Sequence, residues 1–498
     1  MTFDYDVIVI GSGPGGYATA LRASDLGLNT AVIEMRDVVG GTCLNRGCIP
    51  TKAYLTAAHT LHDAHRASVW GLDVSVNAID MPKLKEAKDK TVSGVVKGLS
   101  QLLKARTVDV IHGEGSLVEA HKVKVTDGDT TRELTAEHIV LATGSHATPL
   151  PQLAFFSGTQ DEVRDAIAAR KVPVLSSDEA LDIDTYPENV VIVGAGAIAL
   201  EFATFWNALG TKVTVLLRKD VPLSRWDAHV SSTVMRTMKR NGVNFETHSS
   251  IISAAEGEVT YSVTNPKNGE VTEKSIPADF VLAAIGRSPH TTAPWFETSG
   301  VELNNRGFVV TDAYGRTNLD NVWAVGDITD GHLLAHEAFE QALTVSQTIA
   351  GKPAKPVDPM TIPQVVYGMI DAVSIGYTTK AAEDAGFEGV EETVVPQLSN
   401  PRVAMLGSNG TTVVVSALAR KDEGKSDEKS EEGEAKRLVI GVHMAGPQAS
   451  EIAGAAREII QNRIPLSDAA QALFAHPTLS ETLGESLLKA DGRPLNVR

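Results

Sequence analysis

Length, composition and charge exclude several classes of protein. The chain has 498 residues, of which 43% are hydrophobic and 21% charged, which is typical of a globular protein of roughly two to four domains. A net charge of −17 argues against nucleic acid and anionic lipid as partners. The apolar stretch 190–200 is shorter than the roughly 18 residues of a transmembrane helix. Asp4 and Asp6 stand where a signal peptide carries positive charge, so we expect a cytoplasmic protein without a membrane partner.

Residues 5–34 show the pattern of a strand, a glycine-rich turn, a helix and a second strand, a βαβ unit that binds a dinucleotide. Gly11 permits the tight turn, Gly13 lets the backbone approach a pyrophosphate, and Gly16 allows close packing of the helix. The helix N-terminus then presents its amides to the phosphates. Glu34 ends the second strand, where a carboxylate accepts hydrogen bonds from ribose hydroxyls. A solvated strand end is the alternative reading of Glu34.

The chain's two cysteines, Cys43 and Cys48, lie in GGTCLNRGCIPTK at 40–52. Two cysteines cannot form a disulfide framework or, alone, a four-ligand zinc site, and their closeness favours redox chemistry. Their Cα atoms reach the roughly 4.4 to 6.8 Å of a disulfide only if the segment bends, which Gly47 and Pro50 allow. The N-terminus of a following helix would stabilise a thiolate. A pair of inert buried thiols is the alternative.

Residues 188–217 repeat the pattern of 5–34, and a matched pair of such units predicts two dinucleotide sites. The second turn keeps Gly194 and Gly196 but has Ala199 in place of the third glycine.

The end of the second unit differs from that of the first. Leu217 stands where the first unit has Glu34, and the basic residues Arg218, Lys219 and Arg225 follow. Loss of the carboxylate removes its repulsion of a 2′-phosphate, with which guanidinium groups can pair. The pocket therefore favours NADP over NAD. The alternative is that these basic residues are ordinary surface charges.

Strands expected at 138–149, 280–291 and 321–329 would complete two nucleotide domains of α/β architecture, the second inserted in the first. We therefore assign the first nucleotide domain to 1–150 and 283–355, and the second to 151–282.

The remainder of the chain predicts a third domain. Three prolines mark 351–359 as a linker, and an α+β domain is expected over 356–498. Its strands are expected near 362–376 and 411–419, and its helices near 450–462 and 480–489. Residues 421–436 are rich in charge and almost free of apolar side chains, which predicts a mobile loop between two strands, or alternatively an acidic partner-binding tract.

Several motifs together resemble one family. The cysteine segment, LATGS at 141–145, AVGDIT at 324–329, LLAHEAFEQA at 333–342 and HPTLSE at 476–481 are similar to those of the pyridine nucleotide-disulfide oxidoreductases. The last two motifs resemble the dihydrolipoyl dehydrogenase branch. The resemblance implies two Rossmann-like dinucleotide-binding domains, a C-terminal α+β dimerisation domain, FAD and NAD or NADP as cofactors, and a homodimer.

The resemblance also implies roles for individual residues. Cys43 would be the interchange thiol that meets a substrate dithiol, and Cys48 would face the flavin. Lys52 would lie beside the flavin and pair with Glu201. Further cofactor-binding positions carried over from the family are Gly115, Thr143, Gly144, Asp327 and Ala335 for FAD, and Gly286 with Arg287 for the nicotinamide nucleotide. Ala197 and His290 depart from the residues usual in the family.

His476 and Glu481 are the expected base and its orienting carboxylate. An imidazole takes a proton from a thiol and returns it near neutral pH. The alternative is that TLSE at 478–481 forms a capping box at the start of the last helix, which would explain Glu481 without catalysis. In the family this segment completes the site of the other subunit.

The leading hypothesis is an FAD-dependent dithiol-disulfide oxidoreductase that converts dihydrolipoamide and NAD(P)+ to lipoamide and NAD(P)H through a Cys43–Cys48 disulfide. Its partner would be dihydrolipoamide or the lipoyl domain of a 2-oxo acid dehydrogenase-type complex. The first alternative is an NADPH-dependent reductase of another disulfide. The second is a structural FAD-binding subunit of a multienzyme complex.

Overall fold

The structure, a computed structural model, describes residues 2–419 and 436–498. The charged segment predicted as a loop therefore lies, but for its last residue, outside the described residues, between strands β21 (Thr411–Leu418) and β22 (Arg437–Gly446). Of the helices described, none combines the length and the apolarity that crossing a bilayer requires.

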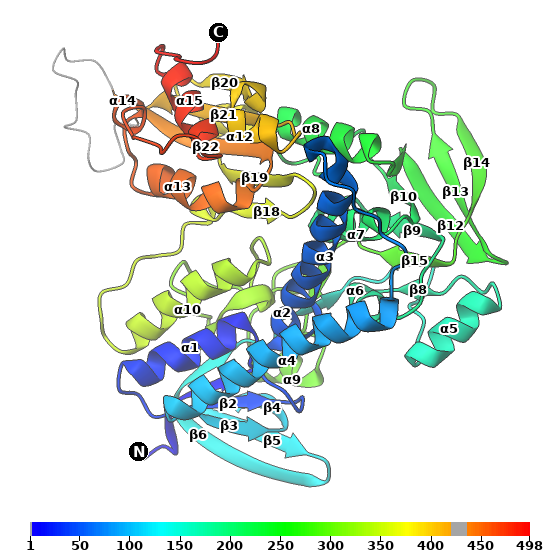
Figure 1. Cartoon of the computed structure of the whole chain (residues 1–498). Coiled ribbons are helices and arrows are strands. Elements are labelled where there is room, and N and C mark those ends of the chain that lie inside the picture. The colour runs from blue at the N-terminus through cyan, green and yellow to red at the C-terminus, as the bar shows by residue number, and fades with distance from the viewer. Residues whose placement is uncertain (1, 420–435) are drawn as a thin grey trace.

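The first nucleotide unit is built on a sheet with strand order β3-β2-β1-β6-β5-β4, in which β17 pairs with β6. The strands β1, β2, β3, β6 and β17 are parallel, and an antiparallel extension, β4 and β5, continues from β6. Helices α1, α10 and α4 pack beside this sheet (Figure 1). The bounds are β1 (Tyr5–Ile10), β2 (Thr30–Glu34), β3 (Asp109–His112), β4 (Glu114–Glu119), β5 (Lys122–Asp127), β6 (Thr130–Leu141), β17 (Val322–Ala324), α1 (Pro14–Asp25), α4 (Met81–Ala105) and α10 (Ala335–Ile349).

The second nucleotide unit has a parallel sheet of order β11-β10-β9-β15-β8 and a small antiparallel sheet of order β12-β13-β14. Both βαβ units and the strands that complete them agree with the sequence prediction. The bounds are β8 (Val174–Leu175), β9 (Asn189–Val193), β10 (Lys212–Leu217), β11 (Asn244–Thr247), β12 (Ser249–Ala255), β13 (Glu258–Thr264), β14 (Val271–Pro277), β15 (Phe280–Ala283), α7 (Ala197–Ala208) and α8 (Ala228–Arg240).

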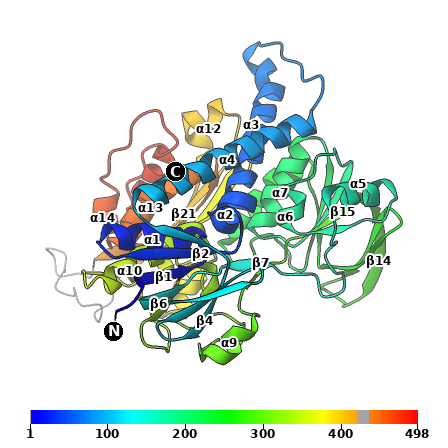
Figure 2. The same ribbon diagram turned by 90° about the horizontal axis from the view of Figure 1, so that it is seen from below.

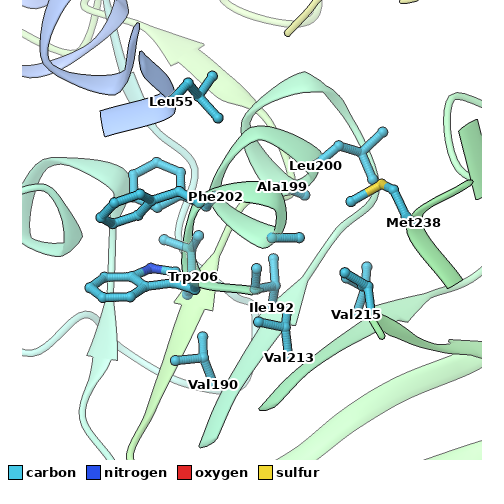
Figure 3. Packing of buried hydrophobic residues seen from close by; sticks show 14 of the residues in the cluster. Leu55, Val190, Ile192, Ala199, Leu200, Phe202, Trp206, Val213, Val215 and Met238 are labelled. Atoms are coloured by element: carbon cyan, nitrogen blue, oxygen red, sulfur yellow. The ribbon is translucent and has the colours of Figure 1, made fainter. Parts of the chain in front are cut away.

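The core of the second unit reaches into the first. Trp206 and Phe202 of α7 pack among the apolar side chains of β9 and β10, and Leu55 of helix α3 (Cys48–Arg66) joins the same cluster (Figure 3). Tyr54 of α3 stacks on Phe205 with ring centroids 4.5 Å apart. Because α3 begins at Cys48, this packing fixes the cysteine segment against the second nucleotide unit.

The C-terminal unit is an antiparallel sheet of order β18-β19-β22-β21-β20, covered by α13 and α15. The predicted strand at 362–376 is two strands, because the Asp371 carboxylate accepts a hydrogen bond from the Gly368 amide (3.3 Å) and holds a turn between them. The bounds are β18 (Gln364–Val366), β19 (Asp371–Gly376), β20 (Glu391–Pro396), α13 (Ala449–Gln461) and α15 (Glu481–Ala490).

Two short strands cross between the nucleotide units. The strands β7 and β16 pair antiparallel, so the chain's passage into the second unit lies beside its return (Figure 2). These and the other short elements are β7 (Ser145–Ala147), β16 (Arg287–Pro289), α2 (Gly41–Arg46), α5 (Gln160–Ala168), α6 (Ser177–Ala180), α9 (Pro294–Ser299), α11 (Thr379–Asp384), α12 (Pro401–Met405), α14 (Leu466–Ala469) and 3₁₀ helices at Ala67–Trp70, Gly326–Ile328, Pro359–Thr361 and Gln397–Ser399.

Candidate active site

The first glycine turn forms a cradle at the N-terminus of α1. Gly11 has φ +101°, and a Cβ there would lie 2.4 Å from the Ala142 carbonyl oxygen; a Cβ at Gly16 would lie 1.9 Å from the Gly11 carbonyl oxygen. A Cβ at Gly13 would instead meet nothing closer than the Cα of Gly41, at 4.0 Å. Two glycines are therefore required by the turn and the helix packing, while Gly13 leaves room for a ligand against the backbone.

Glu34 is held at the rim of this cradle. Its carboxylate is buried and accepts hydrogen bonds from the Ser12 amide (3.1 Å), the Ser12 hydroxyl (2.5 Å) and the Arg36 amide (2.9 Å). A carboxylate has about four acceptor positions, so Glu34 keeps the capacity to accept from a further hydroxyl. The ribose contact remains a prediction.

The second cradle repeats this geometry at the N-terminus of α7. Gly194 has φ +116°, and a Cβ there would lie 2.2 Å from the Ala284 carbonyl oxygen, whereas a Cβ at Gly196 would meet nothing within 4 Å. Ala199 is fully buried at the third position.

The end of β10 has no carboxylate. Leu217 is buried there, and three basic side chains, those of Arg218, Lys219 and Arg225, line the cavity beyond it. Within the described residues none of the three belongs to an ion pair; the neighbouring Asp220 carboxylate instead contacts His248 at 2.8 Å. The rim of the second cradle is therefore positive.

The cysteine segment bends as the sequence predicts. Helix α2 ends before Gly47, whose φ of −144° and ψ of −107° break the helix, and Cys48 is the first residue of α3. The side chains of Cys43 and Cys48 are free thiols that hydrogen-bond to each other. This bond raises the pKa of Cys43 and lowers that of Cys48, which the nearby Lys52 ammonium lowers further. Cys48 is thus the thiol that ionises first.

Lys52 and Glu201 form the predicted pair, with Nζ and Oε2 2.7 Å apart. The Lys52 ammonium also lies 4.5 Å from the centroid of the Tyr367 ring, and the Tyr367 amide donates to Glu201 at 3.2 Å. Burial alone would lower the pKa of Lys52, but the charge and hydrogen bond of Glu201 outweigh it and raise that pKa. Burial raises the pKa of Glu201 against the effect of Lys52. The pair places a fixed ammonium beside the Cys48 sulfur.

One continuous cavity, here called the central cavity, connects both cradles with the thiols. It is bordered by these predicted site residues: Gly11, Gly13, Glu34, Cys43, Cys48, Lys52, Gly115, Thr143, Gly144, Gly194, Gly196, Glu201, Leu217, Arg218, Arg225, Gly286, Arg287, Asp327 and Ala335. Gly16, which packs inside the first turn, is not in its lining. The open face of Gly13 and the buried Glu34 carboxylate fit FAD in the first cradle, and the open face of Gly196 fits a nicotinamide dinucleotide in the second.

Arg287 is engaged at the junction of the two units. Its guanidinium donates to the Ser145 hydroxyl and carbonyl, both at 2.7 Å, and Ser145 in turn donates to Asp327 at 2.6 Å. Its predicted contact with the nicotinamide nucleotide remains a prediction.

The two departures from the family pattern also border the central cavity. Ala197 opens α7. Burial, and then the charges of His146 and Arg287, lower the pKa of His290 to about 4, so this imidazole is neutral at pH 7.

His476 and Glu481 lie together but away from the thiols of their own chain. His476 Nδ1 and Glu481 Oε1 are 2.8 Å apart, and the His476 side chain is 71% exposed. Neither residue lines the central cavity. The capping-box alternative is wrong, because α15 begins at Glu481 itself, with Ser480 as its N-cap and no side-chain cap. The Thr478 hydroxyl donates to the Ala475 carbonyl (2.7 Å), and the Thr478 amide donates to Glu481 (2.7 Å). One carboxylate therefore holds the imidazole and the turn before α15.

Sequence reasoning missed two aromatic residues of the site. Tyr367, which lies against Lys52, belongs to a segment without a motif. Tyr17 lies near both thiols, whose charges, after burial, raise its pKa; its place directly after the glycine turn was the only signal.

Two nucleotide cradles that open onto one thiol pair define the class: an oxidoreductase that exchanges electrons between a dinucleotide and a dithiol. Comparison with known families gives the particular assignment. Residues 5–342 match the pyridine nucleotide-disulphide oxidoreductase model, and residues 430–487 match the dimerisation domain of that family. The chain belongs to the pyridine nucleotide-disulphide oxidoreductase family and carries its dimerisation domain.

Its relatives agree with this assignment. The chain is 32% identical to the dihydrolipoyl dehydrogenase of Geobacillus stearothermophilus and 33% identical to that of Bacillus subtilis, with 99% of this chain and 97% of each relative covered. Among solved structures, LpdA from Mycobacterium tuberculosis has a TM-score of 0.80 at 24% identity, with 97% of this chain and 99% of the other covered. The HOCl-induced flavoprotein disulfide reductase RclA from Escherichia coli, in its Cu(II) complex, has a TM-score of 0.78 at 23% identity, with 98% and 99% covered. These two structures share the fold.

Proposed function

We propose that the protein is a homodimeric FAD enzyme that oxidises dihydrolipoamide with NAD+ or NADP+, or catalyses the reverse reaction. The observation that carries this proposal is the Cys43–Cys48 pair at the start of α3, with Lys52 beside it, in one cavity with both cradles. The dihydrolipoyl dehydrogenases to which the chain is similar support the choice of substrate.

The thiol chemistry balances with one substrate and one nucleotide. A substrate thiolate attacks Cys43 in the oxidised pair, which breaks the Cys43–Cys48 bond and releases the Cys48 thiolate. The second substrate thiol then displaces Cys43, so that the substrate leaves as a disulfide and the protein pair holds two electrons and regains its protons. Bound FAD supplies the two-electron relay from this pair to the nicotinamide. Overall, dihydrolipoamide and NAD(P)+ give lipoamide, NAD(P)H and one proton.

The residues around the thiols suit them to separate roles. The Cys43 hydrogen bond and the Lys52 ammonium both lower the pKa of Cys48, so Cys48 is the better leaving group when the disulfide opens. Cys43, with its raised pKa, suits contact with the substrate sulfur.

We propose that His476 of the partner subunit provides the base. The His476 imidazole is 71% exposed, and its Nδ1 lies 2.8 Å from Glu481 Oε1. An oriented and exposed imidazole is suited to accept a proton from a thiol of another subunit. In its own chain it lies outside the central cavity, so a site that uses it needs a second copy. The dimerisation domain supports this arrangement.

NADP is the nucleotide that the second cradle favours in this proposal. Leu217 offers no acceptor to a ribose 2′-hydroxyl, and Arg218 with Arg225 offers charge to a 2′-phosphate. The same feature favours the second candidate function, an NADPH-driven reductase of another disulfide. We also propose the lipoyl domain of a 2-oxo acid dehydrogenase-type complex as the macromolecular partner, and a cytoplasmic location, where a thiol pair is kept reduced.

An anaerobic titration of the purified holoenzyme tests the proposal. Dihydrolipoamide, NADH and NADPH are added separately while absorbance is scanned from about 400 to 700 nm, and turnover is measured with each nucleotide. The proposal expects dihydrolipoamide to bleach the flavin band and to be turned over. Bleaching by NADPH but not by dihydrolipoamide would instead support the disulfide reductase, and bleaching by none would support a structural subunit.

A further inference from the structure

The turn between β18 and β19 supports the pair of Lys52 and Glu201 at two points. The Tyr367 amide donates to Glu201 Oε1 at 3.2 Å, while Glu201 Oε2 lies 2.7 Å from Lys52 Nζ. The Tyr367 ring lies 4.5 Å from the same ammonium. Because Glu201 is 5% exposed, its carboxylate depends on these donors rather than on water. The place of the Lys52 ammonium therefore depends on the position of the turn.

Asp371, the first residue of β19, fixes this turn to helix α13. Its side chain is buried, and the carboxylate accepts hydrogen bonds from the Gly368 amide (3.3 Å), the Ser450 amide (3.3 Å) and the Ser450 hydroxyl (2.5 Å). Ser450 lies in the first turn of α13, within the match to the dimerisation domain. Hydrogen bonds to a buried carboxylate are among the stronger ones in a protein. The turn is therefore held from the C-terminal unit.

These contacts form a continuous series from α13 to the thiols. Helix α13 contacts β19, and α7, which carries Glu201, contacts both β18 and α3 (Figure 1). Lys52 follows Cys48 by one turn of α3. The interaction of two charges falls with the distance between them, so a displaced ammonium would stabilise the Cys48 thiolate less. Loosening of the turn should therefore raise the pKa of Cys48.

The charge of Asp371 would act in the opposite direction from its hydrogen bonds. The titratable and charged groups that face Asp371, Tyr367 and Cys48 come from α2, α3, α7 and α13, and they are Cys43, Lys52, His59, Glu201 and Glu451. A nearby negative charge disfavours a thiolate. Removal of the Asp371 charge by itself would thus lower the pKa of Cys48, whereas loss of its hydrogen bonds would raise that pKa.

We propose that Asp371 is a positioning residue for the thiol pair, because it fixes to α13 the turn that keeps Glu201 and the Lys52 ammonium beside Cys48. The inference rests on the proposed function and adds a residue of the C-terminal unit to its thiol chemistry. Asp371 does not contact the sulfurs; it acts through Tyr367 and Glu201. The ionisation of Cys48 thus depends on the C-terminal unit as well as on the cysteine segment.

The test follows the ionisation of Cys48 in holoenzyme that carries Cys43→Ser. Cys48 is then the one thiol in the chain, and the serine hydroxyl can still donate a hydrogen bond to it. Thiolate absorbance at about 240 nm is followed against pH. We expect Asp371→Ala to raise the midpoint by about one pH unit, which is tenfold in the ionisation constant. Ser450→Ala keeps the charge of Asp371 and should raise the midpoint by roughly a third as much.

Two further variants separate positioning from general loosening. In a Lys52→Met background, Asp371→Ala should no longer raise the midpoint, because the ammonium that it positions is absent. Asp227→Ala is the matched control. Asp227 is 5% exposed, and its carboxylate accepts from the His229 amide (2.8 Å) and the Val230 amide (3.1 Å) at the start of α8. Its loss also removes a buried carboxylate with its hydrogen bonds, but it should leave the midpoint of Cys48 unchanged.

An unchanged or lowered midpoint in Asp371→Ala would overturn the inference. So would an equal rise in Asp227→Ala, or an undiminished rise in the Lys52→Met background. If Asp371→Ala does not fold, the Ser450→Ala midpoint decides in the same way. Dihydrolipoamide turnover of the wild type is assayed separately. Its absence would refute the proposed function, whereas the midpoints are measured without substrate.

Discussion

The two nucleotide cradles share the same glycine-turn geometry and differ at the end of the strand that follows the helix. Gly11 and Gly194 both take a positive φ with no room for a Cβ, and the second glycine of each turn opens toward the central cavity. Yet β2 ends in Glu34, whereas β10 ends in Leu217 followed by Arg218. The backbone geometry of the glycine turn suits any dinucleotide. The residue at the end of the following strand is the one positioned to contact the ribose, and its identity can differ without altering the turn. Recognition of phosphates and choice of nucleotide are therefore separable.

The largest expected effect comes from the thiol pair on which both cradles converge. Cys48→Ser should lower dihydrolipoamide oxidation at least ~1000-fold, because serine cannot form the disulfide that accepts the substrate's electrons. Binding of FAD and of NADP should persist, since neither cradle is touched. Steady-state kinetics and equilibrium dialysis measure the two properties. Retained turnover in Cys48→Ser would show that the cradles do not meet at this pair.

Exchange of the strand end should change the choice of nucleotide. Leu217→Glu combined with Arg218→Ala gives the second cradle the carboxylate of the first, and we expect the ratio of kcat/KM for NADPH to that for NADH to fall ~100-fold. Lys267→Ala, on an exposed turn, is the control for loss of one positive charge. A wild type that already prefers NADH would contradict the role assigned to Arg218.

Alanine substitution of the two glycines of the second cradle should affect two different properties, the stability of the fold and the binding of the nucleotide. Gly194→Ala should lower the free energy of unfolding by about 2 kcal/mol or more, because its φ of +116° and the carbonyl 2.2 Å away leave no room for a Cβ. Gly196→Ala should leave stability unchanged and raise the KM for the nucleotide by about tenfold, because its Cβ would enter the open space of the cavity. Chemical denaturation and nucleotide kinetics measure the pair. Equal destabilisation by both substitutions would contradict the division of roles between them.

Much of the fold could be predicted from the sequence, because its main unit occurs twice and depends on residues that are close together in the chain. The glycine turns, their flanking strands and the Gly47 break follow from periodicity and backbone chemistry within a few residues. The division of 362–376 into two strands could not be predicted. It depends on a hydrogen bond from the Gly368 amide to the Asp371 carboxylate, and a pattern of hydrophobic residues does not indicate such a bond.

The site was predictable where one motif holds it and was missed where distant segments meet. Cys43, Cys48 and Lys52 lie within one segment, so their proximity was expected. Tyr367 reaches Lys52 from the turn between β18 and β19 of the C-terminal unit, and only tertiary packing brings them together. His476 is the opposite case, since its motif was evident but its own chain places it outside the central cavity.

The smallest expected effect lies in the pH dependence of the thiols between the cradles. The hydrogen bond from Cys43 and the charge of Lys52 both lower the pKa of Cys48, so in the wild type Cys48 becomes a thiolate at lower pH than an ordinary cysteine. Lys52→Met removes the charge and leaves burial to act against ionisation, so the pKa of Cys48 should rise and the thiolate should appear at higher pH. Lys52→Arg keeps the charge and should stay closer to the wild type. Thiolate absorbance near 240 nm, followed against pH in the reduced protein, measures the midpoint. A midpoint in Lys52→Met that stays at the wild-type pH would mean that the charge of Lys52 does not contribute to the ionisation of Cys48.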